Sequence, residues 1–322
     1  MKSLTIATFI SNNEKCNENF FKFIEYIQKE LSVKVIIFTD QKIENINHNF
    51  KQIVKNKTTK YKRIIQLIKL SETNNILCID NDITIDYKNL KNFITEFIDS
   101  KYAIGWGKIR TININKFIPQ LIKIDKNLSH DFIRPLLWKL KLGISIPGQI
   151  FALKKDKFID KLPKIDTVYD DLTIGMIARK NNFEYFYSKS YLGSEFPKGN
   201  FIDLIKQRIR WSKGMAQSIF NGIKYNMLNF VLIHAFMYHM LWIPYYILLF
   251  IISKYNLIFA SILFLLVSMI LSEVKIKDIL WAICFMLIFP IIHSIWFIFF
   301  IYNIIRYNLN SLWNNLIYYK LK

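Results

Sequence analysis

The sequence predicts an α/β domain with a mostly parallel sheet, followed by a domain of transmembrane helices. Two observations support this prediction. From residue 4 to residue 179, short apolar segments alternate with segments of helical periodicity, which is typical of parallel sheets covered by helices. Toward the carboxyl terminus, three stretches of 29, 18 and 27 residues carry no charged side chain. About 20 apolar residues are enough for a helix to cross the hydrocarbon core of a bilayer.

The elements of the α/β domain follow from these patterns in order. The predicted strands cover residues 4–9, 33–38, 50–54, 76–79 and 148–153, and the predicted helices cover residues 20–31, 60–70, 87–98 and 172–179. The second strand segment, VKVIIF, is rich in β-branched residues, as in strands that are buried on both faces. Ligands of such sheets bind beyond the carboxyl ends of the strands, and Asp40 and Asp80 follow or end two of them.

The uncharged stretches predict membrane segments near residues 228–252, 256–272 and 279–304. We therefore expect an N-terminal domain over residues 1–225 and a membrane domain over residues 226–322. The alternative is a set of core helices in a soluble protein. It is disfavoured because these segments offer no polar face to water.

The charge of the chain indicates an anionic partner. The 322 residues include 44 Lys and Arg against 24 Asp and Glu, a net charge of +20, which suits nucleic acid, the cytoplasmic leaflet or a phosphate-bearing substrate. No nucleic-acid-binding motif is recognisable, and basic residues alternate with acidic ones, so we expect no nucleic-acid partner. The basic residues just before the first membrane segment are Lys206, Arg208, Arg210, Lys213 and Lys224. By the positive-inside rule they place the N-terminal domain in the cytoplasm, with Arg208 in a flank that binds anionic lipid.

Acidic pairs mark two points of the α/β domain. Asp80 and Asp82 flank Asn81 at the end of a predicted strand, and two carboxylates at this spacing can bind Mg²⁺ or Mn²⁺, which would neutralise a diphosphate. Asp170 and Asp171 precede a predicted helix. They are either functional carboxylates or helix N-terminal residues favoured by the dipole.

In this order and spacing, the motifs resemble those of the family 2 glycosyltransferases, in particular the membrane-anchored inverting enzymes with a GT-A (Rossmann-like) fold. The resemblance covers about residues 3–215 and continues into the family's membrane tail. It departs from the family at the end of the first strand, where only Asn13-Glu14 matches. It implies a metal site at Asp80 and Asp82. It also implies a donor-binding site at Asp40, Asp80, Gln207, Arg210 and Trp211, the last three forming the family's QxxRW motif.

The resemblance also assigns the chemistry. Asp171 takes the place of the catalytic base, with Asp170 beside it where the family commonly has Glu, and Asp40 takes the place of the residue that contacts the nucleotide base. Mg²⁺ or Mn²⁺ is the implied cofactor. The implied activity is that of a hexosyltransferase (EC 2.4).

Such an enzyme would move a sugar from a nucleotide-sugar donor to a lipid or polyprenyl-phosphate acceptor at the cytoplasmic face of the membrane, with membrane lipids as partners. The product would be a cell-envelope glycan or a glycolipid. Two alternatives remain: a polysaccharide synthase subunit that polymerises sugars, and a non-catalytic membrane adaptor with the same fold. Three membrane segments are too few to enclose a sugar-wide channel, which favours single transfer.

Overall fold

The computed structural model describes residues 3–11, 17–43, 50–55, 58–112, 114–165, 167–273 and 275–320. The Asn13-Glu14 match lies outside these residues. By its internal contacts the chain divides into a sheet unit, Met1–Ile112 with Arg134–Phe196, and a helical unit, Asn113–Ile133 with Pro197–Lys322. Residues 113–133 and 197–224 group with the C-terminal part of the chain, because their helices pack against its apolar helices. The boundary expected near residue 225, between a catalytic and a membrane domain, stays a prediction.

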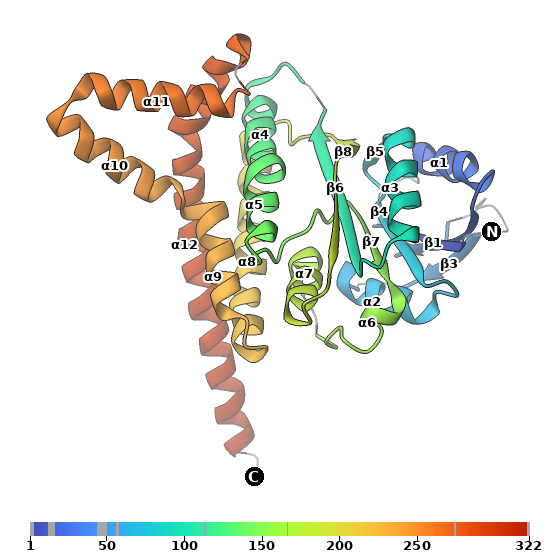
Figure 1. The fold of residues 1–322 in the computed structure, drawn as a ribbon. Helices are drawn as coiled ribbons and strands as arrows, with labels where there is room; N and C mark the ends of the chain where they lie inside the picture. Colours follow the sequence, from blue (N-terminus) through green and yellow to red (C-terminus); the bar gives the residue numbers. More distant parts are fainter. Residues whose placement is uncertain are drawn as a thin grey trace. The chain divides into compact units, whose positions relative to one another are not determined.

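The sheet unit is built on an eight-stranded sheet in the order β3-β2-β1-β4-β7-β6-β8-β5 (Figure 1). The strands are β1 (Ser3–Ile10), β2 (Ser32–Thr39), β3 (Phe50–Val54), β4 (Asn75–Asp80), β5 (Ile83–Ile85), β6 (Ile104–Thr111), β7 (Ile150–Lys154) and β8 (Tyr185–Glu195). Strands β3, β2, β1 and β4 run parallel to one another, as do β6 and β8. Strand β7 is antiparallel to β4 and β6, and β5 is antiparallel to β8. The predicted mostly parallel α/β sheet is confirmed.

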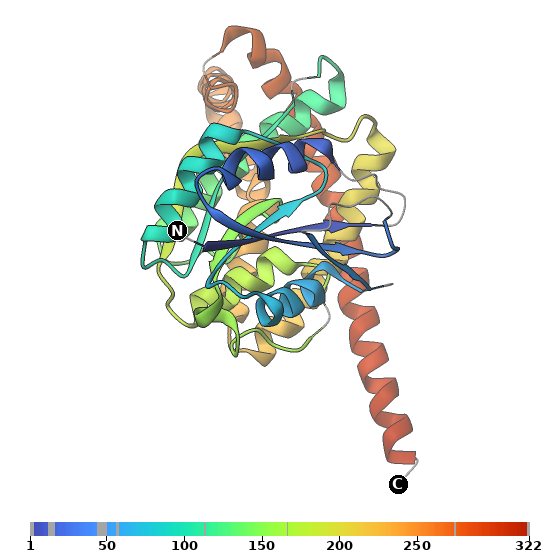
Figure 2. The same ribbon diagram turned by 90° about the vertical axis from the view of Figure 1, so that its right-hand side faces the viewer.

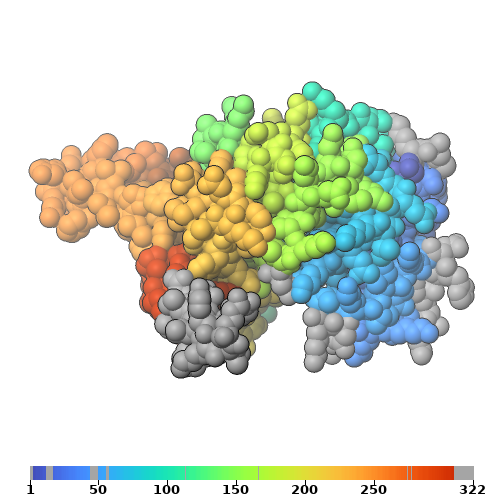
Figure 3. All heavy atoms as spheres, turned by 90° about the horizontal axis from the view of Figure 1, so that it is seen from below, coloured from blue at the N-terminus to red at the C-terminus, as the bar shows by residue number. Residues whose placement is uncertain are grey.

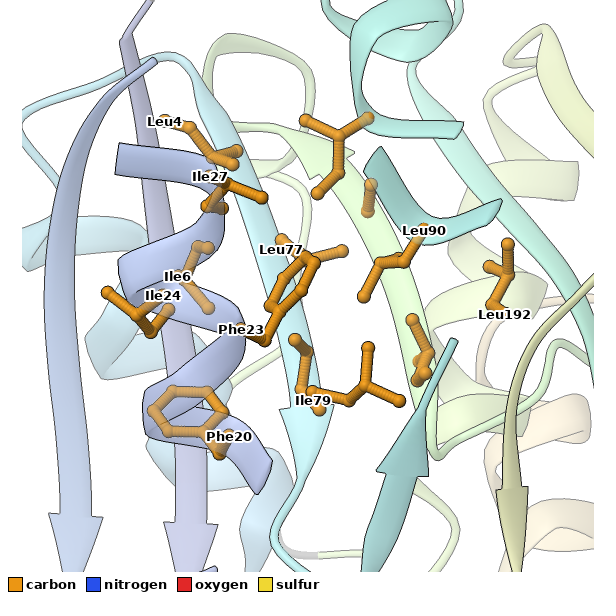
Figure 4. Close-up of a cluster of buried hydrophobic side chains, with 14 of the residues drawn as sticks. Leu4, Ile6, Phe20, Phe23, Ile24, Ile27, Leu77, Ile79, Leu90 and Leu192 are labelled. Atoms are coloured by element: carbon orange, nitrogen blue, oxygen red, sulfur yellow. The ribbon is translucent and has the colours of Figure 1, made fainter. Parts of the chain in front are cut away.

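Helices cover both faces of this sheet (Figure 2). Helices α1 (Glu18–Gln28) and α3 (Tyr87–Asp99) lie on one face. Helices α2 (Lys60–Leu70), α6 (Lys155–Phe158) and α7 (Asp170–Lys180) lie on the other, and α5 (Arg134–Lys139) contributes Trp138 to the core there. In α1, Phe20, Phe23 and Ile24 recur at helical spacing and pack against the sheet (Figure 4), as expected of an amphipathic helix with one buried stripe. These two apolar layers fix the strand ends that carry the site.

The helical unit consists of α4 (Phe117–Asn127), α8 (Phe201–Lys224), α9 (Leu228–Ala235), α10 (Trp242–Tyr255), α11 (Leu257–Leu271) and α12 (Ile276–Lys320), with two π-helical turns, η1 (Leu128–Ile133) and η2 (Phe236–Met240). Helices α8 and α12 run side by side (Figure 1). Leu121 of α4 and Leu204 of α8 share a core with Phe285 and Phe289 of α12.

The lengths of the apolar helices can be compared with the three predicted membrane segments. Within the described part of the chain, one helical stretch, Asp278–Tyr307 of α12, is by itself long and apolar enough to cross a membrane. Leu228–Met240 and Trp242–Tyr255 reach that length only together, and they are bent by 54°. Helix α11 is a shorter apolar helix. The three membrane segments stay a prediction, with α12 as their strongest member.

Candidate active site

Two of the predicted acidic residues meet around a lysine that the sequence analysis did not single out. Asp80 ends β4, Asp170 begins α7, and Lys60 begins α2. The ammonium Nζ of Lys60 lies 2.6 Å from Oδ1 of Asp80 and 3.4 Å from Oδ2 of Asp170, and it donates a hydrogen bond of 2.7 Å to the carbonyl oxygen of Gly148. Figure 3 shows the face on which the region of α2, in blue, adjoins the region of α6 and α7, in yellow-green. The cluster therefore joins three distant parts of the sequence.

One local feature of the sequence does distinguish Lys60. It occupies the first position of a helix, where the macrodipole disfavours a positive charge. Its side chain is only 22% exposed. The two carboxylates therefore offset both the unfavourable interaction with the helix dipole and the loss of hydration of the ammonium. A lysine at the first position of a helix therefore indicates that acidic partners lie elsewhere in the chain. The local sequence does not show which residues these partners are.

Burial and neighbouring charges perturb the pKa values of Asp80 and Lys60 in this cluster. Burial raises the pKa of Asp80 to about 7. The pairing with Lys60 acts against this increase, and the negative charges of Asp170 and Asp82 add to it. Burial works against the ammonium of Lys60, yet Asp170 and Asp80 outweigh it and raise the pKa of Lys60 above its ordinary value. The site is therefore crowded with negative charge around one cation, and groups with perturbed pKa values are typical of functional sites.

Asp171 lies beside this cluster, against the chain at Gly148. A methyl group built at Gly148 would lie 3.4 Å from Cβ of Asp171 and 3.6 Å from its Oδ2, an ordinary contact distance. Its Oδ1 accepts a 2.8 Å hydrogen bond from the backbone N–H of Leu172. Burial first, and then Asp170, raise the pKa of Asp171 to about 6, while Leu172, Lys60 and Arg134 act in the opposite direction. The two adjacent carboxylates thus have different surroundings: Asp170 pairs with Lys60, and Asp171 lies next to Gly148.

The turn after β4 holds the predicted metal ligands. Asn81 is buried, and Asn17 binds it through two hydrogen bonds, from its backbone N–H to Oδ1 of Asn81 at 3.0 Å and from its Nδ2 to the Asn81 carbonyl at 2.8 Å. Asp82 is exposed. The described residues contain no group of three or more His, Cys, Asp or Glu side chains suited to a metal ion. Two carboxylates completed by substrate phosphate oxygens are nevertheless a usual ligand set for Mg²⁺, so Asp80 and Asp82 fit the predicted ion.

Asp40 lies on the same edge of the sheet, directly after β2. Its carboxylate forms an ion pair with the guanidinium of Arg63 on α2, another residue that the sequence analysis did not single out. In the sheet order, β2 is separated from β4 by β1 alone. Asp40 and Asp80 thus lie at the carboxyl ends of parallel strands, as predicted, and the role of Asp40 stays a prediction.

The predicted donor-binding residues Gln207, Arg210 and Trp211 all lie on α8, in the helical unit. Arg210 is exposed, whereas Gln207 and Trp211 are half-buried. Their part in donor binding stays a prediction that rests on the QxxRW motif.

Arg208, between these residues, corrects the sequence analysis. We expected it in a flank that binds anionic lipid, but it is 2% exposed. Its Nη2 donates a 2.6 Å hydrogen bond to Oδ2 of Asp125 on α4, and its guanidinium lies 4.3 Å from the ring centroid of Trp211. The side chain is a buried link between α4 and α8, because the cost of burying its charge is offset by the carboxylate and the indole face.

Comparison with known proteins identifies the family and the fold of the chain. A family model described as glycosyl transferase family group 2 matches residues 75–309, more than half of the chain. A mannosyltransferase from Pyrobaculum calidifontis, solved with GDP-Man and Mn²⁺, is 12% identical with a TM-score of 0.50, over 90% of this chain and 86% of that one. Glucosyl-3-phosphoglycerate synthase from Mycobacterium tuberculosis, solved with Mn²⁺, UDP-glucose and phosphoglyceric acid, is 12% identical with a TM-score of 0.50, over 68% and 79% of the two chains. These structures share the fold. Among the curated proteins, none matches this sequence.

Proposed function

Because this chain belongs to glycosyl transferase family group 2, we propose that it transfers one sugar from a nucleotide-diphosphate sugar to a hydroxyl of a lipid-linked acceptor. The observation that carries the proposal is the cluster of Lys60, Asp80 and Asp170, with Asp171 beside it, at the edge of the sheet. This cluster would supply both a positive group for a diphosphate and a carboxylate for an acceptor.

The donor diphosphate would bind at the end of β4. Mg²⁺ or Mn²⁺ held by Asp80 and Asp82 would neutralise its charge, the chemistry that such an ion supplies when bound. The ammonium of Lys60, 2.6 Å from Asp80, is a second positive group for the charge that grows on the leaving diphosphate. Fixed positive groups of this kind stabilise a transition state without reorganisation.

The transfer is a single in-line displacement. The acceptor oxygen bonds to the anomeric carbon, the bond from that carbon to the diphosphate oxygen breaks, and its electron pair leaves with the nucleoside diphosphate. The hydroxyl proton passes to Asp171, whose pKa of about 6 leaves it largely ionised near neutral pH and a stronger base than an ordinary Asp. One displacement inverts the anomeric centre. A hydroxyl acceptor needs this base, whereas a lipid phosphate is already ionised, so Asp171 favours the hydroxyl.

The lipid acceptor and the cytoplasmic face are supported by the apolar helices and the basic residues before them. The stretch Asp278–Tyr307 is long and apolar enough to span a membrane, and Lys206 and Lys213 on α8 are exposed. A cysteine introduced at exposed Ser190 of the sheet unit should resist membrane-impermeant thiol reagents in intact cells. Ready labelling there would place the sheet unit outside and away from cytosolic nucleotide sugars.

A donor panel tests the activity. The purified protein in detergent is incubated with UDP-, GDP-, ADP- and CDP-sugars, Mn²⁺ and a lipid extract, and released nucleotide and glycolipid are measured. We expect turnover of one donor and a product that carries one added sugar. Asp171→Asn should abolish it and Asp160→Asn, a change at an exposed carboxylate, should not. No turnover of any donor contradicts the proposal, and a ladder of products indicates polymerisation.

A further inference from the structure

One side chain holds the turn between β4 and β5 from the start of α1. The Nδ2 group of Asn17, the N-cap of α1, donates hydrogen bonds of 2.8 Å to the carbonyl oxygen of Asn81 and 2.9 Å to that of Ile83. Its backbone N–H donates a third bond, of 3.0 Å, to Oδ1 of Asn81. Asp82, the exposed member of the predicted metal-binding pair, lies between Asn81 and Ile83 in the chain. One carboxamide therefore fixes the backbone on both sides of Asp82.

The carboxamide of Asn17 is itself fixed. Its Oδ1 accepts a 2.9 Å hydrogen bond from the backbone N–H of Asn19. A carboxamide has one oxygen and two N–H donors, so all of its polar groups are engaged. Phe20 and Phe23 of the same helix pack in the core of the sheet unit (Figure 4). The position of Asp82 is thus tied to a helix that cannot shift without disturbing a close-packed core.

The two predicted metal ligands are therefore held in different ways. Asp80 is held through its carboxylate, whose Oδ1 lies 2.6 Å from Nζ of Lys60. Asp82 is exposed, and the bonds from Asn17 hold its backbone neighbours rather than its carboxylate. The carboxylate of Asp82 is thus placed in advance, and none of the bonds from Asn17 occupies it.

A ligand that is placed in advance matters most for a small ion. Mg²⁺ requires a near-ideal octahedron of oxygen ligands at about 2.0–2.1 Å, whereas Ca²⁺ accepts irregular ligand sets at about 2.3–2.6 Å. A loosened turn would therefore cost Mg²⁺ more affinity than Ca²⁺. Residues that orient a metal ligand typically contribute about 10–100-fold to metal affinity, and Asn17 has the contacts for this role.

We propose that Asn17 is a positioning residue, which holds Asp82 where it can share a small divalent ion with Asp80. The side chain of Asn17 does not bind the ion. It acts through the backbone of the turn, and its loss should affect Mg²⁺ and Mn²⁺ more than Ca²⁺. The inference rests on the proposed function for the place of the ion at Asp80 and Asp82, and it is tested by ion binding alone.

The test is a titration of the full-length protein in detergent with Mn²⁺, in which electron paramagnetic resonance reports the free ion and Mg²⁺ or Ca²⁺ competes. Asn17→Ser keeps an oxygen that can cap α1 and removes both N–H donors to the turn. We expect Mn²⁺ and Mg²⁺ to bind about 10-fold more weakly or worse, and Ca²⁺ to lose less. Melting temperatures identify the folded variants.

A double-mutant cycle shows whether the effect passes through Asp82. In the Asp82→Asn background, Asn17→Ser should not weaken the residual Mn²⁺ binding further, because the carboxylate that Asn17 positions is absent. A general loosening of the sheet unit would instead weaken ion binding in both backgrounds.

Two further variants complete the test. Asn200→Ser makes the same change at the N-cap of α8, in the helical unit, where the side chain bonds to Asp203, and it should leave Mn²⁺ binding unchanged. If Asn17→Ser does not fold, Asn81→Ala takes its place. It removes the acceptor of the backbone N–H of Asn17 and should weaken Mn²⁺ binding about 5-fold, the usual effect of one hydrogen bond.

The inference is overturned if wild-type protein binds no Mn²⁺, or if the folded turn variant keeps the wild-type affinity. It is also overturned if Mg²⁺ and Ca²⁺ lose affinity equally, or if Asn17→Ser has its full effect without Asp82. Ion binding that depends on Asn17 without any sugar transfer would instead refute the proposed function and leave the inference standing.

Discussion

Replacing Asp171 by Asn should make the protein more stable and inactive at the same time. Burial and Asp170 raise the pKa of Asp171 from 3.8 to about 6, so the folded state disfavours the ionised form. The difference of 2.2 units corresponds to about 3 kcal/mol, at about 1.36 kcal/mol for each unit. An amide of the same shape does not carry this cost.

The pH dependence follows from the sign of the shift. A carboxyl whose pKa is raised on folding is fully protonated in both states only well below its unfolded pKa of 3.8, and there it costs nothing. As the pH rises from 3.8 to about 6, the unfolded chain releases its proton first and the folded state loses stability. Above pH 6 the loss is complete. The advantage of Asp171→Asn should therefore grow between pH 4 and pH 6 and then stay constant.

The assay compares apparent melting temperatures of wild type, Asp171→Asn and the surface control Asp160→Asn at pH 4.5 and pH 7.5, together with turnover. We expect Asp171→Asn to melt higher at pH 7.5 by a clearly larger margin than at pH 4.5, and to lose about 10²–10⁴-fold in rate, as for a missing general base. If Asp171 served only the first turn of α7, Asn would remove its favourable interaction with the helix dipole and lower stability by about 0.3–1 kcal/mol. A lower melting temperature with retained turnover would thus refute the reasoning.

Three further outcomes can be checked. Lys60→Met should weaken binding of a nucleoside diphosphate about 10-fold or more, because charge-assisted hydrogen bonds contribute about 1.5–3 kcal/mol. The control is Lys62→Met, at an exposed position of the same helix. Equal affinities of the two variants would contradict the prediction. Asp82→Asn should remove the effect of Mn²⁺ on this binding, so full turnover in EDTA would count against a metal site. Arg208→Leu should lower the melting temperature, because it removes the buried guanidinium and leaves the carboxylate of Asp125, which is 23% exposed, without its ion-pair partner, and an unchanged melting temperature would argue against a stabilising pair.

The first half of the sheet could be predicted because its signals are local. The predicted strand over residues 33–38 is β2, Ser32–Thr39, and the predicted helix over residues 60–70 is α2, Lys60–Leu70. Strand β6 was missed. Its sequence, IGWGKIRT, contains two glycines, which weaken a strand pattern. The structure explains both, since a methyl group at Gly105 would come within 2.7 Å of the Phe97 ring on α3 and one at Gly107 within 2.6 Å of the Leu192 side chain on β8.

The two residues that the sequence analysis missed, Lys60 and Arg63, and the one that it misassigned, Arg208, fall into one physical class. Lys60, Arg63 and Arg208 are basic residues on helices, where their spacing resembles that of ordinary surface cations. Their partners Asp80, Asp40 and Asp125 lie 20, 23 and 83 positions away along the chain. Helical periodicity reports which face is apolar and says nothing about such pairs. The acidic residues were found because their positions after strands and before a helix are visible in the sequence itself.

These ion pairs also show that the net charge of the whole chain does not describe the charge at the site. A chain of +20 suggests that its basic residues attract the anionic substrate, but the site itself has the opposite sign. Lys60 stands among four carboxylates, those of Asp80, Asp82, Asp170 and Asp171, and Arg134 is the second cation that acts on Asp171, so acidic groups outnumber basic ones. A diphosphate would be repelled by this group. We therefore expect binding of the proposed donor to need added positive charge at the end of β4, and a divalent ion at Asp80 and Asp82 would supply it while Lys60 stays beside Asp80. The acidic character of the site is thus a physical reason for metal dependence, independent of any motif.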